Sequence, residues 1–154
     1  MFFNNKKMIA ILALIIFFVS LDRLLKIIVY DAYVIEPISL VGDLFHFSFA
    51  ANYNIAMSIP FSGVWIILLN SFIVIVLMYY FLQSIRKNLV MKVFSLGMVI
   101  AGALSNIVDR IKFGFVVDYL DLKYFTIFNL ADVMIVCGIS ILIYMNFKVS
   151  KKVS

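Results

Sequence analysis

Two aspartates of this chain stand in apolar surroundings where a carboxylate is costly. Asp118 lies between Val117 and Tyr119, where a charged carboxylate must be either hydrated or paired with another polar group. Asp132 begins an apolar run, three residues after Asn129. Two carboxyl groups that lie close together cannot both ionise readily, so they share a proton. One can then act as general base towards water and the other as general acid towards a carbonyl, a chemistry that needs no histidine, cysteine or metal.

Asp132 also admits a purely structural explanation, which is the simpler one when the residue is taken alone. Asn129 is a residue type that caps helix N-termini, and an acidic side chain in the first turn complements the helix dipole. Asp118 has no comparable structural role in its apolar segment. A second carboxyl group within reach would explain both aspartates at once, so capping and catalysis both stay open for Asp132.

Further polar residues lie near the ends of apolar runs, where such groups are functional candidates by default. Asp22 and Lys26 are four residues apart and share one helix face. They either support a site or form an ion pair that makes both charges tolerable, and Asp109 with Arg110 admits the same two interpretations. Asn106 lies three residues before Asp109, which predicts a hydrogen-bonding cluster or an amide that holds two membrane helices together.

The composition restricts the kind of protein that these residues serve. Of 154 residues, 66% are hydrophobic and 14% are charged, and the mean hydropathy is +1.14. A soluble domain needs about 25% charged residues to cover its surface. The single cysteine and single histidine exclude a disulfide framework and a Cys/His metal site built from this chain alone. The chemistry must therefore use carboxylates, amides, hydroxyls and lysines in a membrane.

Four apolar runs predict four transmembrane helices in a single membrane domain over residues 1–154. The first run follows a short basic leader but has no small-residue cleavage site, so we expect a retained helix rather than a signal peptide. An even number of spans leaves both termini on the same side. The expected fold class is an all-α polytopic membrane protein whose helices span approximately residues 8–30, 63–82, 93–108 and 130–147.

The net charge of +5 is explained by the orientation of the chain in the membrane rather than by nucleic-acid binding. Lys and Arg collect in cytoplasmic segments near helix ends, so their positions predict which side of the membrane each segment occupies. Eight of the 13 basic residues fall on the expected cytoplasmic side. The other five basic residues and all eight acidic residues fall on the opposite side, which gives that side a net charge of −3. We expect an N-in, C-in arrangement with the acidic chemistry at the extracytoplasmic surface. The eight cations of the expected inner side are Lys6, Lys7, Arg86, Lys87, Lys92, Lys148, Lys151 and Lys152.

Two segments of the expected outer side have the pattern of strands. Residues 45–49 alternate aromatic and polar side chains, as in a strand with one apolar face. That face could lie on lipid or on the helix ends. Residues 111–129 are too short to span a membrane and contain a run of β-formers at 116–121. A small β-structure is therefore expected beside the helices.

Four motifs at residues 22–26, 52–58, 102–110 with 114–119, and 128–132 carry a resemblance to a known family. They are similar to D-x-x-x-K, N-x-G-x-A-[FW]-S, G-G-x-x-G-N-x-x-D-R with its continuation G-x-V-x-D-[FY], and F-N-x-A-D. These patterns are typical of the lipoprotein signal peptidases, or signal peptidase II, which are four-span bacterial membrane aspartic endopeptidases. The resemblance covers nearly the full length. The last two motifs together are specific, whereas the first alone is weak.

The resemblance implies a catalytic dyad of Asp118 and Asp132, and an extracytoplasmic β-cradle where the alternating strand is expected. It implies a monomeric enzyme of the bacterial cytoplasmic membrane that needs no cofactor and binds no nucleic acid. The implied partners are membrane lipid and a prolipoprotein whose cysteine already carries diacylglyceryl, cut on the amino side of that cysteine. The residues that it assigns to substrate binding or to support of the site are Asp22, Lys26, Asn52, Asn106, Asp109, Arg110 and Asn129.

The chain departs from the family pattern at four positions. Asn54 and Met57 replace a usual glycine and a usual aromatic residue, and Ala101 and Ser105 stand where glycines are common. Asparagine tolerates positive φ better than most residues, and methionine fills apolar space with less defined shape. We expect these changes to affect the shape of the substrate pocket, and hence the preferred sequence around the cleavage site, more than the dyad.

Two other functions fit some of these residues. Asp22, Lys26, Asp109 and Asp132 could form an ion or proton path in a small transporter component, but such a path should carry polar groups to the middle of the membrane and beyond. The second alternative is a non-catalytic relative of the peptidase, against which the presence of both Asp118 and Asp132 argues.

Overall fold

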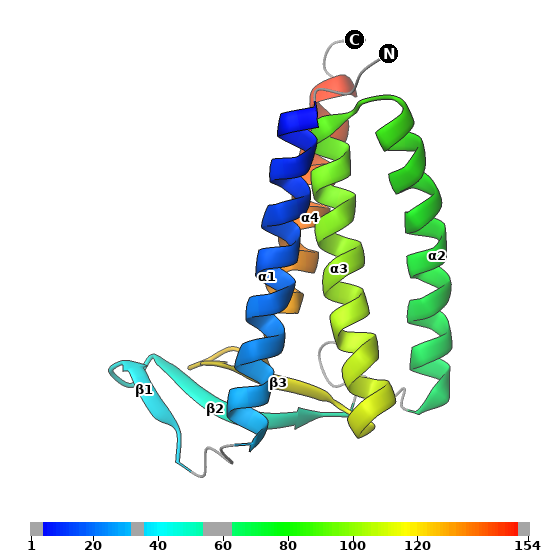
Figure 1. The fold of residues 1–154 in the computed structure, drawn as a ribbon. Coiled ribbons are helices and arrows are strands. Elements are labelled where there is room, and N and C mark those ends of the chain that lie inside the picture. The colour runs from blue at the N-terminus through cyan, green and yellow to red at the C-terminus, as the bar shows by residue number, and fades with distance from the viewer. Residues whose placement is uncertain (1–4, 32–35, 54–62, 151–154) are drawn as a thin grey trace.

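The computed structural model of the chain describes residues 5–31, 36–53 and 63–150. Four helices form a bundle, and a small antiparallel sheet lies across one end of it (Figure 1). All four helices are long and apolar enough to cross a membrane, as the four apolar runs predicted. Their bounds are α1 (Asn5–Asp31), α2 (Val64–Arg86), α3 (Val90–Phe113) and α4 (Leu130–Ser150).

Helix α3 is the central element of the bundle. It packs against α1, α2 and α4, and most of its span is buried, whereas only a small part of each of the other three spans is buried. Helix α3 also extends beyond the predicted run 93–108 at both ends. Asp109 and Arg110, which follow the predicted run, therefore belong to the helix as Asn106 does, and Asn106 and Asp109 are buried.

Two glycines allow α3 and α4 to approach each other closely. A Cβ on Gly102 would lie 2.5 Å from the carbonyl oxygen of Ala131, and a Cβ on Gly138 would lie 2.6 Å from the carbonyl oxygen of Ser95. Real Cβ atoms do not come so near to a backbone oxygen, so either side chain would force the helices apart. Small residues commonly permit such contacts between membrane helices.

The sheet consists of four antiparallel strands in the order β1-β2-β3-β4, namely β1 (Ile38–Val41), β2 (Phe45–Asn52), β3 (Val116–Leu122) and β4 (Ile127–Phe128). Both predicted strand segments are confirmed, as β2 and β3. They pair with Ala50 opposite Asp118 and Asn52 opposite Val116, after an irregularity between Phe47 and Ala50. This register brings the end of β2 to the aspartate of β3.

The apolar face of the sheet lies on the helix ends. Val117 and Tyr119 of β3 form a buried cluster with Val29 of α1, and Phe47 and Phe49 of β2 pack against it. The alternation of aromatic and polar residues in β2 is thus explained by this packing. The sheet is anchored to α1 through that cluster.

The beginning of α1 and the end of α4 lie at the end of the bundle opposite the sheet, together with the turn between α2 and α3 (Figure 1). The positions Asn54 and Met57, on which the predicted change in substrate preference rests, lie outside the described residues.

We predict that Gly102→Ala and Gly138→Ala each destabilise the bundle. An inserted methyl group has no room between α3 and α4, and overpacking of this kind costs about 1–3 kcal/mol. The measurement is thermal unfolding of the purified protein in detergent. Ala10→Val, which adds volume on the exposed face of α1, is the control and should leave the unfolding temperature unchanged. Unchanged unfolding of both glycine variants would contradict the close approach.

Candidate active site

The side chain of Lys26 is 1% exposed and lies among carboxylates from two helices. Its Nζ is 3.0 Å from Oδ2 of Asp22 and 2.7 Å from Oδ2 of Asp109. It also donates a hydrogen bond of 2.9 Å to Oδ1 of Asn106. The ion pair expected from the four-residue spacing of Asp22 and Lys26 is therefore present, and it joins a larger network that reaches α3.

Asp22 connects α1 to α3, β3 and α4. Its Oδ2 accepts a hydrogen bond of 2.6 Å from the Ser105 hydroxyl of α3. Its Oδ1 accepts from the Tyr119 hydroxyl of β3 at 3.0 Å and from the backbone N–H of Ala131 of α4 at 3.1 Å. The Tyr119 hydroxyl in turn accepts from the N–H of Leu130, 3.1 Å away. The carboxylate thus sits at the N-terminus of α4, where the helix dipole favours negative charge.

Asp109 takes its two ion pairs from α1. Arg23 and Lys26 both contact its carboxylate, and the backbone N–H of Val117 donates to its Oδ2 at 3.4 Å. The neighbouring Arg110 acts electrostatically on the carboxyl groups of Asp132, Asp118 and Asp109. Asp109 therefore holds α1, α3 and β3 together, while the charge of Arg110 acts on the two aspartates considered for catalysis.

Asp118 and Asp132 are connected through Asn129. The Nδ2 of Asn129 donates to Oδ1 of Asp118 at 2.6 Å, and its backbone N–H donates to Oδ2 of Asp132 at 3.3 Å. Asn52 of β2 donates to the other oxygen of Asp118 at 2.9 Å, and Asn106 donates to the other oxygen of Asp132 at 2.8 Å. Each carboxyl group is thus held on both oxygens by amide donors.

The capping explanation for Asp132 is confirmed. The backbone N–H of Asp132 donates to Oδ1 of Asn129 at 2.9 Å, while Asp132 accepts from the N–H of Asn129. This reciprocal pair is a capping box at the N-terminus of α4. Capping does not compete with pairing of the aspartates, because the same asparagine that forms the box also binds Asp118.

Asp118 lies outside the helices, is 2% exposed and has an unusual affinity for protons. Burial, followed by the negative charge of Asp132, raises the pKa of Asp118 from its ordinary value of 3.8 to about 7. The hydrogen bonds from Asn52 and Asn129 oppose this rise without cancelling it. A carboxyl group with such a pKa exchanges its proton readily near neutral pH, as a general acid or base must.

Every residue that the sequence nominated lies at the end of the bundle that carries the sheet. Asp22, Lys26, Asn106 and Asp109 form the ionic part, and Asn106 and Asn129 connect it to the two aspartates through a hydrogen bond of 3.3 Å between their amides. Across residues 5–31, 36–53 and 63–150, no group of three or more histidine, cysteine or acidic side chains could hold a metal ion.

Three residues of this network were not assigned a role from the sequence. Arg23 pairs with Asp109, the Ser105 hydroxyl donates to Asp22, and Tyr119 bridges Asp22 and the start of α4. A role for Tyr119 could have been predicted from the sequence, because a tyrosine in a buried strand needs a hydrogen-bond partner for its hydroxyl. Burial also raises the pKa of the Tyr119 phenol, so it remains a proton donor.

Comparison with known proteins identifies the family. The family model described as signal peptidase (SPase) II matches residues 14–148. The chain belongs to the signal peptidase II family. The lipoprotein signal peptidase of Halothermothrix orenii is 36% identical over 88% of this chain and 92% of its own. That of Clostridioides difficile is 34% identical over 90% and 95% respectively.

Solved structures agree with this assignment at the level of the fold. A bacterial membrane enzyme determined at 2.3 Å resolution matches with a TM-score of 0.81 and 22% identity, covering 93% of this chain and 90% of its own. A second, at 1.9 Å resolution, matches with a TM-score of 0.70, 23% identity, and coverage of 90% and 93%. This member of the signal peptidase II family is thus a protease and a multi-pass membrane protein.

The raised pKa of Asp118 predicts that the stability of the protein falls as the pH rises from about 4 to about 7. An acid with a pKa of 3.8 unfolded and about 7 folded binds its proton more tightly in the folded state. Its contribution is therefore complete below pH 4 and is lost as the pH passes through 7; it amounts to roughly 4 kcal/mol at most.

The measurement is thermal unfolding in detergent across this pH range. Asp118→Asn removes the titrating group, so its unfolding temperature should fall less than that of the wild type. Asp43→Asn, in the exposed turn between β1 and β2, should behave as the wild type does. Parallel curves for wild type and Asp118→Asn would show that the carboxyl group of Asp118 is not perturbed.

Proposed function

We propose that the chain is an aspartic endopeptidase that removes the signal peptide from prolipoproteins. Asp118 and Asp132 are the catalytic pair in this proposal. The observation that carries it is the position of Asn129, which donates hydrogen bonds to both carboxyl groups and so fixes them relative to each other. Acid–base catalysis requires such fixed geometry before it requires a suitable pKa.

Hydrolysis by this pair follows from the chemistry of two carboxyl groups that share one proton. The ionised member removes a proton from water as the water attacks the peptide carbonyl, and the protonated member gives its proton to the carbonyl oxygen. The tetrahedral intermediate then collapses as a proton passes to the leaving amine. Arg110, whose charge acts on both aspartates, favours the state in which one of them is ionised.

The supporting residues keep the pair in place rather than react. Asn52 and Asn129 bind the two oxygens of Asp118, while Asn106 and the N–H of Asn129 bind those of Asp132. Carboxyl groups held on both oxygens have little freedom to rotate. Positioning of this kind reduces the reorganisation needed at the moment of reaction.

The proposed substrate is a prolipoprotein whose cysteine carries diacylglyceryl, cut on the amino side of that cysteine. The relatives named above are lipoprotein signal peptidases, and the motifs around the two aspartates resemble theirs. A lipid anchor and an apolar signal helix would hold the substrate in the membrane plane. The exposed apolar faces of the helices, such as Phe72 and Ile75 on α2, suit such surroundings.

The proposed orientation has the sheet and the two aspartates on the extracytoplasmic side of the bacterial cytoplasmic membrane. Lys6 and Lys7 at the beginning of α1, Lys92 in the first turn of α3 and Lys148 in the last turn of α4 support it, since cytoplasmic ends collect cations. A monomer suffices for this chemistry, because one chain supplies all the residues named.

A transport function has less support. The buried charged residues of the described part, Asp22, Lys26, Asp109 and Asp118, belong to one network at the sheet end of the bundle. A path for ions would need polar groups along the remaining length of the helices. A non-catalytic role is disfavoured by the amide contacts of both aspartates.

We predict that Asp118→Asn and Asp132→Asn each lower the rate of cleavage by about 10²- to 10⁴-fold, the usual contribution of a general acid or base. The assay incubates the detergent-purified protein with diacylglyceryl prolipoprotein and follows the loss of the signal peptide by gel shift. Asp121→Asn, on the same strand as Asp118 but outside the network, is the matched control and should cut normally. If the wild type does not cut, or if either test variant cuts at the control rate, the proposed dyad is wrong.

A further inference from the structure

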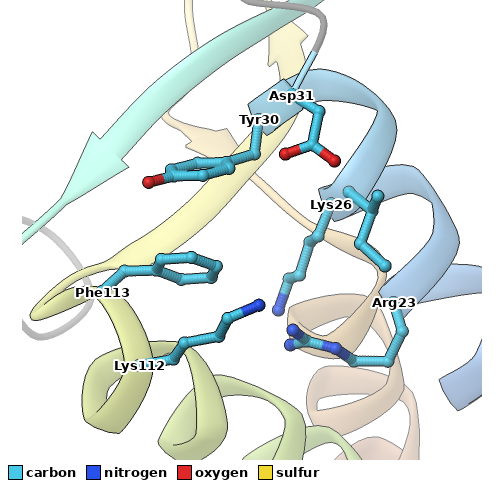
Figure 2. A pocket seen from close by; sticks show the side chains of 7 residues that line it. Arg23, Lys26, Tyr30, Asp31, Lys112 and Phe113 are labelled. Carbon is cyan, nitrogen blue, oxygen red and sulfur yellow. The ribbon is translucent and has the colours of Figure 1, made fainter.

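A pocket of about 170 Å³ lies between the last turns of α1 and α3 and borders the ionic network, because Arg23 and Lys26 line it. Figure 2 shows that its polar walls differ in charge: the ammonium groups of Lys26 and Lys112 and the guanidinium of Arg23 point towards one another, and the carboxylate of Asp31 lies across from them. The rings of Tyr30 and Phe113 complete a third wall.

The charges of this pocket are not equally available to a ligand. Arg23 and Lys26 already form ion pairs with carboxylates of the buried network. Lys112 and Asp31 are exposed, and neither takes part in an ion pair within the segments that the structure describes. The Nζ of Lys112 stands 4.8 Å from the centre of the Phe113 ring. One cation and one carboxylate thus face the same pocket without neutralising each other.

A ligand that fits these walls carries both signs of charge. A phosphodiester would lie against Lys112 and the outer edge of the Arg23 guanidinium, since both donate charge-assisted hydrogen bonds to phosphate oxygens. An ammonium group on the same ligand would lie against Asp31 and the ring of Tyr30, which attract cations by charge and by cation–π interaction. A purely anionic ligand would meet the carboxylate of Asp31 at an energetic cost.

The position of the pocket indicates where such a ligand comes from. Its lining residues come from the ends of α1 and α3, two helices long and apolar enough to span a membrane, and these ends lie on the side of the sheet (Figure 1). Ile27, which lines it, and Ile111, which precedes Lys112, are exposed apolar residues that acyl chains would cover. Basic pockets between membrane helices bind the phosphate groups of lipid head groups.

We propose that this pocket binds the zwitterionic phosphoethanolamine head group of a membrane phospholipid. The phosphate lies on Lys112 and Arg23, and the ammonium lies on Asp31. This binding is separate from peptide hydrolysis and holds the end of α1 against the end of α3 from the lipid side.

The test is native mass spectrometry of the detergent-purified full chain titrated with short-chain phospholipids. The wild type should bind dihexanoyl phosphatidylethanolamine at least about tenfold more tightly than dihexanoyl phosphatidylglycerol. The glycerol head group has no ammonium, so it cannot make the charge contact with Asp31. Free phosphoethanolamine and inorganic phosphate are the soluble competitors, and they should displace the lipid only at far higher concentrations because they lack acyl chains.

Two variants separate the two poles of the pocket. Lys112→Gln should weaken binding of both lipids by about tenfold, whereas Asp31→Asn should remove the preference for phosphatidylethanolamine and leave phosphatidylglycerol binding unchanged or stronger. Lys148→Gln and Asp43→Asn, exposed residues away from the pocket, are the matched controls. Thermal unfolding of each variant in the same detergent checks its folding.

Three results would overturn the proposal. The first is equal binding by the two pocket variants and their controls. The second is tighter binding of phosphatidylglycerol by the wild type, which would identify a site for anionic lipid. The third is displacement of the lipid by inorganic phosphate at concentrations as low as those of free phosphoethanolamine, which would identify a site for the free anion.

Discussion

The fold of the sheet end depends on how the charge of Lys26 is compensated. An ammonium group that is almost wholly removed from solvent is tolerated only when carboxylates and hydrogen-bond acceptors surround it. Asp22 supplies one carboxylate from α1 itself, and the other must come from Asp109 of α3. The relative position of these two helices is therefore restricted by electrostatics as well as by packing. Arg23 balances the second carboxylate, so the group of four is neutral as a whole.

The proposed catalytic pair is attached to this neutral group rather than included in it. Asn106 accepts from Lys26 on one side and donates to Asp132 on the other. Asp22 accepts from the N–H of Ala131, beside Asp132 in the first turn of α4. Lys26 thus orients Asn106, which binds Asp132, and Asp22, which binds the residue before Asp132. This arrangement explains why several of the few ionisable residues of the chain gather at the sheet end of the bundle.

The sequence predicted those features that depend on neighbours along the chain. The pair of Asp22 and Lys26 follows from helical spacing, the capping box from Asn129 and Asp132, and strand β2 from its alternation. The short strands β1 and β4 have no such pattern, and they form because β2 and β3 offer free edges.

Contacts between elements were harder to predict, for a physical reason. Arg23 contacts Asp109, and Ser105 contacts Asp22, only because α1 crosses α3 at that height. Ser105 stood out in the sequence as a departure from the family glycine, yet its hydroxyl has a specific partner in this chain. Such pairings depend on how each helix is rotated about its axis and shifted along it. The pattern of apolar residues defines these positions only to within about one helical turn.

A double-mutant cycle on Lys26 and Asp109 tests the central claim most directly. Lys26→Met leaves two buried carboxylates with one cation and should cost about 3–5 kcal/mol in unfolding free energy. Adding Asp109→Asn restores the balance of one carboxylate and one cation, so the double variant should be more stable than Lys26→Met alone and should recover part of the cleavage rate. If the double variant instead loses the sum of the two single losses, the charge of Lys26 does not hold the site together.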